Sequence, residues 1–331
     1  MNFSIIIKIF ILLGFYALLQ NSYAEGFKFK KYAGEFMDIG VDARAQAMGG
    51  AFTAIPGGVT SSYYNTAGMF SIKKTQVSFM HTQQIIASVN YDFLAIGHCQ
   101  GENRVLAISL IRLGIDNIMD SRQAQRIIAQ TGDWNIDWSQ IKDFNTSDYI
   151  FTFSIAQKWK NSWIVGANFK LIRRNLAEYN ANGLGFDIGL QKNITNNFIL
   201  GANIKNITTT LLIWNTHEKE LVKPAMYLGT SYNLKIDKLR SCFLPALDVI
   251  LRGENRRKSA TANLGSISFN FAAGIEYSYY QALFLRVGID EISRLNTGIG
   301  LKIPHIRIDY AFTSYNDELG NSHRIGLILS L

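Results

Sequence analysis

The chain has 331 residues, of which 48% are hydrophobic, 12% aromatic and only 18% charged. Soluble domains carry about 25% charged residues, so this composition is unusually apolar for a soluble protein. The formal net charge is +8, with no dense basic cluster beyond Arg256-Arg257-Lys258, which argues against nucleic acid as a partner. For that cluster we expect a solvated loop, with contact to anionic lipid headgroups or lipopolysaccharide as the alternative.

Residues 1–24 have the pattern of a secretory signal peptide. A single positive charge, Lys8, precedes an apolar core, and Ser22-Tyr23-Ala24 forms a small-x-Ala cleavage motif. The apolar core is shorter than the roughly 20 residues that a membrane-spanning helix needs, so we favour cleavage after Ala24 over an uncleaved anchor. The sequence therefore predicts an exported protein.

Glycines and small side chains dominate the following segment, Ala33–Phe70. Asp42 can cap a short helix over residues 43–48, which Gly49 and Gly50 would end. A second short helix is predicted further along, from residue 61 to residue 65. Broken helices leave backbone groups without partners and cannot face lipid. We therefore expect this segment to lie in the periplasm or inside an enclosing structure.

From residue 75 onward, apolar and polar residues alternate with the period of two that a β-strand imposes. In residues 181–193, for example, Leu184 and Phe186 share one face and Asp187 lies on the other. The same alternation puts Glu276 and Asp309 on polar faces. Fourteen strands are predicted, an even number as bacterial barrels require. They cover residues 75–82, 85–97, 103–115, 148–160, 162–174, 181–193, 197–207, 223–234, 242–253, 266–278, 281–289, 295–303, 305–315 and 321–331.

Loop lengths give this series of strands an orientation. With both termini periplasmic, the tight turns at 160–162, 193–197, 279–281 and 303–305 fall inside, and the long loops 114–147, 206–222 and 253–265 fall outside. This asymmetry favours an all-β fold, a fourteen-stranded antiparallel transmembrane β-barrel in the bacterial outer membrane, over a soluble β-sandwich. The predicted parts are a signal peptide (1–24), an N-terminal hatch (25–74) and the barrel (75–331).

The longest outer loop is the predicted surface for partner proteins. It contains a possible amphipathic helix over Asp120–Gln130, followed by Trp134 and Trp138. Long loops are usually functional or disordered, and exposed aromatic side chains anchor protein interfaces. The alternative, equally weighted, is that both tryptophans fold back over the barrel mouth or sit at the membrane surface.

Catalysis has little support in the sequence. We find no Gly-x-Ser-x-Gly motif, no phosphate-binding loop and no Cys/His spacing typical of a metal site. The sequence therefore predicts a protein that is not an enzyme and has no cofactor or metal. Cys99 and Cys242 fall on separate predicted strands, and we expect no disulfide between them.

A series of short motifs resembles the PorV/PorQ-type (UPF0164) family of outer-membrane proteins, which are similar in architecture to the FadL transporters. The motifs occur in order along the chain, and they include Ala33-Gly34-Glu35-Phe36, Met48-Gly49-Gly50-Ala51-Phe52, Tyr64-Asn65-x-Ala67-Gly68, Arg307-x-Asp309-Tyr310-Ala311-Phe312 and Gly320-x-Ser322-His323-Arg324-Ile325. The chain departs from the family pattern in having Ile55-Pro56-Gly57-Gly58 where an acidic pair is usual. It also has Asn65-Thr66-Ala67-Gly68 in place of Asn-Pro-Ala-Gly, and Leu331 in place of a terminal aromatic residue.

The resemblance implies a fourteen-stranded outer-membrane barrel with its hatch in the lumen. It implies a role in type IX protein secretion or surface attachment, with a secretion translocon and cargo proteins as partners. The alternative, taken from FadL-like relatives, is a passive route for hydrophobic small molecules.

Arg44 is the only basic residue between Lys31 and Lys73 in the predicted hatch. Because an unpaired buried charge is very costly, we expect Arg44 to pair with a carboxylate, although a ligand contact is the alternative. The candidate partners are Asp187, Glu276 and Asp309, which lie on the predicted lumen face. Asn65 is expected to be a helix-ending cap rather than to gate a passage. The candidate hatch and lumen residues are Arg44, Gly49, Gly50, Asn65, Gly68, Asp187, Glu276 and Asp309.

Overall fold

The computed structural model describes residues 28–29, 34–84, 89–127, 134–160, 162–254, 256, 259–315 and 320–331. The predicted signal peptide, residues 1–24, lies outside these residues. In the part of the chain that is described, no helix is both long and apolar enough to cross a membrane.

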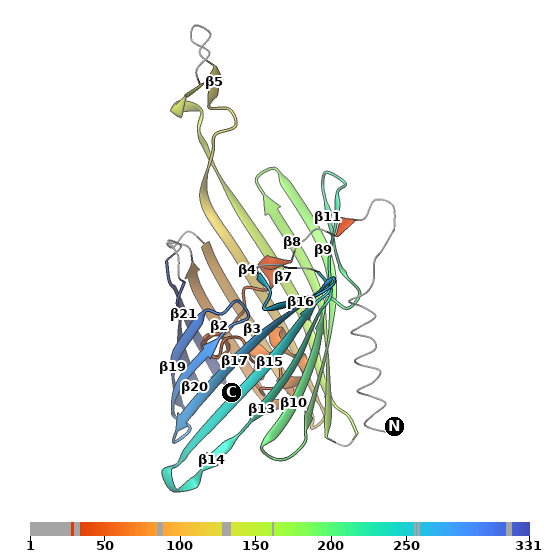
Figure 1. The fold of residues 1–331 in the computed structure, drawn as a ribbon, viewed down its shortest axis with the longest axis vertical. Coiled ribbons are helices and arrows are strands. Elements are labelled where there is room, and N and C mark those ends of the chain that lie inside the picture. The colour runs from red at the N-terminus through yellow and green to blue at the C-terminus, as the bar shows by residue number, and fades with distance from the viewer. Residues whose placement is uncertain are drawn as a thin grey trace.

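Fourteen antiparallel strands form a closed barrel, which confirms the predicted fold class (Figure 1). Each barrel strand pairs with the next along the chain, and the last, β21, pairs with the first, β2, so that Leu327 lies opposite Phe79. The barrel strands are β2 (Thr75–Gln84), β3 (Val89–Gln100), β4 (Arg104–Asp120), β7 (Lys142–Lys158), β8 (Trp163–Leu176), β9 (Tyr179–Asn193), β10 (Phe198–Lys205), β13 (Ala225–Tyr232), β15 (Ser241–Arg252), β17 (Ile267–Tyr279), β18 (Leu283–Ile289), β19 (Leu295–Ile303), β20 (Ile306–Thr313) and β21 (Ser322–Ser330).

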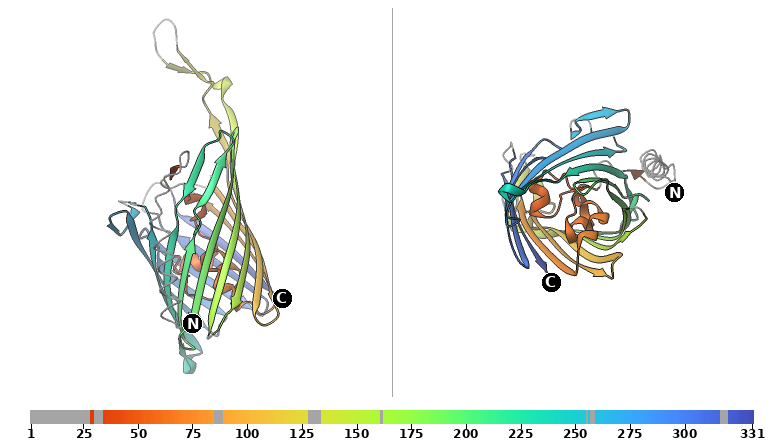
Figure 2. Two further views of the ribbon diagram at one scale, coloured as in Figure 1. Left: turned by 90° about the vertical axis from the view of Figure 1, so that its right-hand side faces the viewer. Right: turned by 90° about the horizontal axis from the view of Figure 1, so that it is seen from below.

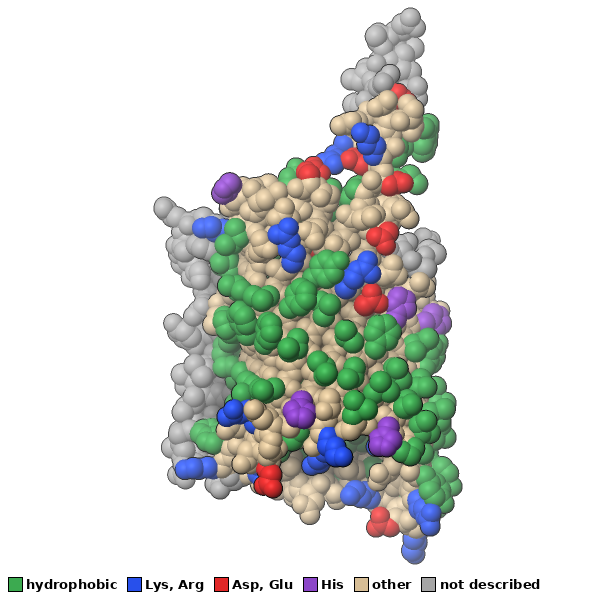
Figure 3. Space-filling view, turned by 180° about the vertical axis from the view of Figure 1, so that it is seen from behind, with side chains coloured by type: hydrophobic (Ala, Val, Ile, Leu, Met, Phe, Trp, Pro, Cys, Tyr) green, Lys and Arg blue, Asp and Glu red, His purple; other side chains and the backbone are tan. Residues whose placement is uncertain are grey.

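Side chains alternate between the outer and inner faces of the wall as predicted. On β9, Leu184 and Phe186 are exposed on the outside, while Asp187 is buried inside. Figure 3 shows apolar side chains gathered over the middle of the barrel surface, with most of the charged ones nearer the two ends. Because lipid-facing positions must be apolar, this belt fits a barrel in an outer membrane.

The two ends of the barrel differ in their connections, as predicted. One end, here called the turn end, has mostly short turns, with one longer connection that contains β14 (Leu234–Ile236) and η5 (Asp237–Leu239). At the opposite, outer end, β4 and β7 continue beyond the barrel into a projecting hairpin (Figure 1). This projection carries β5 (Gln125–Ile127), β6 (Trp134–Ile136) and η4 (Trp138–Gln140).

The helix predicted over Asp120–Gln130 is wrong for the residues that the structure describes. The chain is extended as β4 up to Asp120 and again as β5 from Gln125. Its backbone groups pair with β7 and β6, which supply ladder hydrogen bonds in place of helical ones. Residues 128–130 lie outside the described residues.

The barrel wall is interrupted near its outer end. Toward the outer end, β10 is followed after a short break by β11. On the returning strand, Lys223 and Pro224 separate β12 from β13, because proline has no N–H to donate to the sheet. β13 pairs with β15 up to the Ala225–Arg252 pair, whereas β12 pairs with the short β1. Above that pair, the described strands show no hydrogen bonding between β12 and β15. The bounds are β1 (Lys28–Phe29), β11 (Thr210–Trp214), β12 (Lys219–Val222) and β16 (Ala262–Leu264), the last pairing with β17.

Residues 34–72 fold inside the barrel, as the view along the barrel shows (Figure 2, right). We call this segment the hatch. Its elements are η1 (Glu35–Met37), α2 (Ala43–Ala47), η2 (Gly58–Thr60), α3 (Ser61–Tyr64) and η3 (Thr66–Ser71). The Asp42 carboxylate caps α2 by accepting a hydrogen bond from the Arg44 backbone N–H. Gly49 and Gly50 end α2 with φ angles of 66° and 78°, which glycine adopts without strain.

The hatch and the inner wall share one buried apolar cluster. Met48 and Phe52 of the hatch belong to one buried cluster with the inward-facing Tyr91 and Phe93 of β3 and Ile111 of β4. Inner positions of a water-filled barrel would be polar. Here they are apolar because they face a packed segment of the same chain instead of water.

Elsewhere the hatch backbone lies directly on the wall. Gly288 of β18 faces Met48, and a Cβ atom at this glycine would overlap the Met48 and Gly49 backbone. Gly326 of β21 faces the same helix, but a Cβ there would come no nearer than 3.5 Å, an ordinary contact with Ala43. The first position therefore requires glycine and the second tolerates a methyl group.

We expect Gly288→Ala to loosen the hatch and Gly326→Ala to leave it unchanged. Overpacking of this kind costs about 1–3 kcal/mol because backbone must shift. Amide hydrogen exchange over residues 43–48, in the protein purified in detergent, measures the effect. Equal protection in the two variants would contradict the close approach at Gly288.

Candidate functional site

An ionic cluster joins the hatch to the wall at α2. The Arg44 guanidinium donates two hydrogen bonds to Glu276 of β17, from Nε to Oε2 and from Nη2 to Oε1, both at 2.8 Å. The Glu276 carboxylate also pairs with Arg286 at 2.6 Å and with Arg307 at 3.4 Å. Of the three carboxylates suggested by the sequence, Arg44 therefore pairs with Glu276.

Asp309 of β20 belongs to the same cluster but does not pair with Arg44. Its carboxylate pairs with Arg286 at 2.9 Å and with Arg307 at 2.8 Å. Three guanidinium groups thus share two carboxylates, and the Arg286 side chain is fully buried. Removing one partner from such a cluster is costly because it leaves a charge unpaired in a low-dielectric site.

The cluster shifts the pKa values of two hatch residues, Arg44 and Asp42. Burial lowers the pKa of Arg44, but the adjacent Glu276 outweighs that effect and raises it, so Arg44 stays charged. Burial and the neighbouring Asp309 raise the pKa of Asp42. The Asp42 carboxylate is nevertheless satisfied, because it accepts hydrogen bonds from the Arg44 N–H at 3.0 Å and the Thr60 hydroxyl at 2.9 Å.

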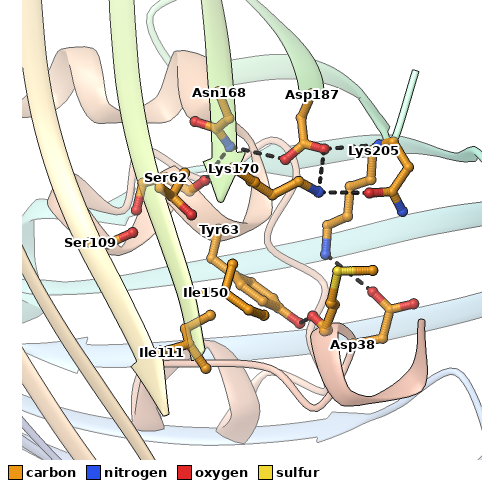
Figure 4. A pocket seen from close by; sticks show the side chains of 13 residues that line it. Asp38, Ser62, Tyr63, Ser109, Ile111, Ile150, Asn168, Lys170, Asp187 and Lys205 are labelled. Carbon is orange, nitrogen blue, oxygen red and sulfur yellow. Dashed lines mark hydrogen bonds and ion pairs between the residues drawn. The ribbon is translucent and has the colours of Figure 1, made fainter. Parts of the chain in front are cut away.

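Asp187 lies in a second cluster, nearer the outer end (Figure 4). Its carboxylate pairs with Lys170 at 2.7 Å and accepts a hydrogen bond from the Asn206 backbone N–H at 2.9 Å. Beside it, Lys205 and Arg252 each approach the hatch residue Asp38 at 3.6 Å. Burial raises the pKa of Asp38, but these two cations outweigh it and hold the pKa below its usual value.

Asn65 and Gly68 sit where the hatch meets β9. The Asn65 amide donates to the Thr53 carbonyl at 2.7 Å and to the Leu190 carbonyl at 3.1 Å, and its oxygen caps η3 at Ala67. Asn65 thus ends α3, as predicted, while its side chain caps the start of η3 and links the hatch to the wall. At Gly68, a Cβ atom would lie 2.7 Å from the Ser61 hydroxyl oxygen, so a side chain would disturb α3.

Two wall residues that hold the hatch were missed in the sequence. The Asp248 carboxylate of β15 accepts hydrogen bonds from the backbone N–H groups of Phe52 and Thr53, both at 3.0 Å, and from the Thr53 hydroxyl at 2.7 Å. Arg324 of β21 donates to the Gly40 carbonyl at 2.7 Å. A charged residue at an inward position of an otherwise apolar strand was the signal that could have identified both.

Of the basic cluster at residues 256–258, the structure describes only Arg256. Its side chain pairs with Glu35 of the hatch at 2.7 Å and with Glu254 at 2.6 Å. Arg256 therefore holds the beginning of the hatch against the outer end of the wall. Contact of the cluster with lipid headgroups or lipopolysaccharide stays a prediction.

Three small pockets adjoin one another around Asp38. The first opens toward the outer end at Glu291 and Arg294, the second is the cavity in Figure 4, and the third lies at the wall interruption beside Pro224. All three are lined by Asp38, and the first two also share Tyr63. Their volumes are about 70, 30 and 20 Å³, room for a few water molecules.

The tryptophans of the outer loop lie far from these clusters, on the projecting hairpin. Trp134 is in β6, and Trp138, in η4, is 71% exposed. Cys99 and Cys242 form no disulfide, as expected.

We expect Arg44→Met to lower the hydrogen-exchange protection of residues 43–48 by about 1–3 kcal/mol. The loss is smaller than for an isolated buried pair because Glu276 keeps two other arginines. Arg122→Met is the matched control, since Arg122 pairs with Asp120 and Glu178 on the exposed projecting hairpin. Unchanged protection in Arg44→Met would show that this pair does not hold the hatch.

No protein-family model and no curated protein matches the chain. Solved structures do match its fold. The Pseudomonas putida toluene transporter TodX shares 12% identity, with 87% of this chain and 96% of that chain covered and a TM-score of 0.53. The Ralstonia pickettii toluene transporter TbuX shares 12% identity, with 88% of this chain and 97% of that chain covered and a TM-score of 0.51. A Pseudomonas aeruginosa FadL homologue shares 9% identity, with 86% of this chain and 96% of that chain covered and a TM-score of 0.51. At such identities the likeness concerns the fold alone, and the barrel is FadL-like.

Proposed function

We propose that this chain forms a passive outer-membrane route for small molecules with a hydrophobic part, with the hatch as its gate. The observation that carries this proposal is the series of three pockets from the outer end, past Tyr63 and Asp38, to the wall interruption beside Pro224. The FadL-like fold supports it, because the structures that it resembles include toluene transporters.

The lining of these pockets indicates what the route would accept. Met37, Ile111 and Ile150 give the middle pocket an apolar side, while Lys170 and Lys205 give it a charged side. A molecule with an apolar body and a polar group would satisfy both. Because the pockets are too small for such a molecule as they stand, the segment around Asp38 must move during passage.

Uptake of toluene by cells that lack their own hydrocarbon channel tests the proposal. We expect expression of this chain to raise the initial rate of uptake several-fold. Ala225→Phe should return the rate to background, because Ala225 lines the pocket at the wall interruption and the larger ring fills it. Ala262→Phe is the control, since Ala262 is an exposed residue of β16 outside the three pockets.

Folding of both variants is checked by the change in electrophoretic mobility on heating that folded barrels show. An unchanged uptake rate with the wild-type chain, or equal rates in the two folded variants, would count against the route.

A second candidate function is supported by the projecting hairpin. Met119 and Trp138 are 69% and 71% exposed there, and Ile136 is 46% exposed. Large apolar side chains on an exposed projection suit a protein partner. This candidate is the secretion-associated role that the resemblance to the PorV/PorQ-type family implies, with a translocon or cargo protein as the partner.

Deletion of the gene, followed by measurement of secreted and surface-attached proteins in the culture, tests this second candidate. We expect a reduced secreted fraction that the wild-type chain restores and Trp138→Ser does not. Leu264→Ser serves as the control, because Leu264 is 73% exposed in β16 at the same end of the barrel. Normal secretion in the deletion strain would contradict the secretion role.

A further inference from the structure

The turn end of the barrel contains a vestibule of about 600 Å³, far larger than the three pockets near Asp38. It lies between the β14–η5 connection, the turn after β17 and the end of β19. Its lining includes five basic side chains and two acidic ones. The basic residues are Arg44, Lys235, Arg240, Lys302 and Arg307, and the acidic residues are Asp237 and Glu276.

Most of this positive charge is not neutralised by the protein. Within the described residues, Lys235, Arg240 and Lys302 take part in no ion pair, and all three are exposed. Arg240 instead lies over the ring of Tyr280, 4.9 Å from its centre. An arginine stacked on an aromatic ring is held in place with its donors directed outward.

The floor of the vestibule is positive as well. Arg44 and Arg307 line it, with 13% and 14% of their side chains exposed. Both form ion pairs with the same carboxylate, that of Glu276. Together with Arg286, they outnumber Glu276 and Asp309 by one charge. Asp42 does not line the vestibule, and its carboxylate is bound by the Arg44 N–H and the Thr60 hydroxyl.

We propose that this vestibule is a binding site for a small anion with two or more carboxylate or phosphate groups. Arg240 and Lys302 would hold the ligand at the rim, and the guanidinium groups of Arg44 and Arg307 would face it from the floor. Arginine and lysine donors form their strongest hydrogen bonds with these two kinds of group. The volume falls in the range of about 300–1,000 Å³ typical of small-molecule sites.

This site is independent of the proposed route for hydrophobic molecules. The vestibule shares no lining residue with any of the three pockets near Asp38, and α2 contributes Arg44 to the vestibule while its end, at Gly49 and Gly50, lines the outer pocket. The hatch therefore separates the two spaces. Absence of toluene uptake would not contradict the anion site, and absence of anion binding would not contradict the route for hydrophobic molecules.

Isothermal titration of the full-length protein in a zwitterionic detergent at low salt tests the proposal, with citrate and pyrophosphate as separate probes. We expect saturable binding of at least one probe. The double variant Arg240→Gln/Lys302→Gln should weaken it by about tenfold or more, because two charged donors are lost. Both side chains are exposed, so the barrel is expected to fold.

The matched control is Lys158→Gln/Lys160→Gln, which removes the same charge from exposed positions at the turn end outside the vestibule. Less than a twofold change in this control, with the tenfold loss above, supports the site. Equal weakening in the two double variants would overturn it, since the effect would then reflect net charge alone. Absence of saturable binding of both probes would overturn it as well.

Discussion

A chain folded inside a barrel must find partners for its backbone and its charges on the barrel wall. The hatch has only one- and two-turn helices, so many of its N–H and C=O groups have no partner within the hatch. The wall supplies those partners from inward-facing side chains. Asp248 receives two backbone N–H groups, and Arg324 donates to the Gly40 carbonyl. This requirement explains why strands of an apolar barrel carry carboxylates and guanidinium groups at buried positions.

The same constraint divides the inner wall into two kinds of surface. Where apolar side chains of the hatch meet the wall, Met48 and Phe52 belong to one buried cluster with the wall residues Tyr91 and Phe93. Where the backbone of the hatch contacts the wall, the wall residue is a glycine, as at Gly288, or a charged side chain that accepts or donates a hydrogen bond. Neither surface suits a water-filled pore, which indicates that the wall is adapted to a resident segment.

Much of this architecture could be predicted from the sequence, because period-two alternation and loop lengths are properties of each strand by itself. The caps of the hatch could be predicted for the same reason, since Asp42, Gly49 and Gly50 act on neighbouring residues. The partner of Arg44 could only be narrowed to three carboxylates, because the choice depends on strand register and on the rotation of the hatch. The helix expected in the projecting hairpin was wrong because β4 and β5 are kept extended by pairing with β7 and β6, and such pairing is not visible in the pattern of a single segment.

The contacts that hold the hatch are shorter at α2 than at Asp38. At α2, Arg44 meets Glu276 through two hydrogen bonds of 2.8 Å, and Glu276 is shared with two further arginines. At the start of the hatch, Asp38 is held by Lys205 and Arg252 at 3.6 Å each, beyond hydrogen-bond range. A straight opening through the barrel would have to break the first set and expose its charges. A sideways opening at the wall interruption requires the second set and the half-exposed Glu35–Arg256 pair to yield. Exposed ion pairs contribute little, which makes the start of the hatch the part that moves at the lowest cost.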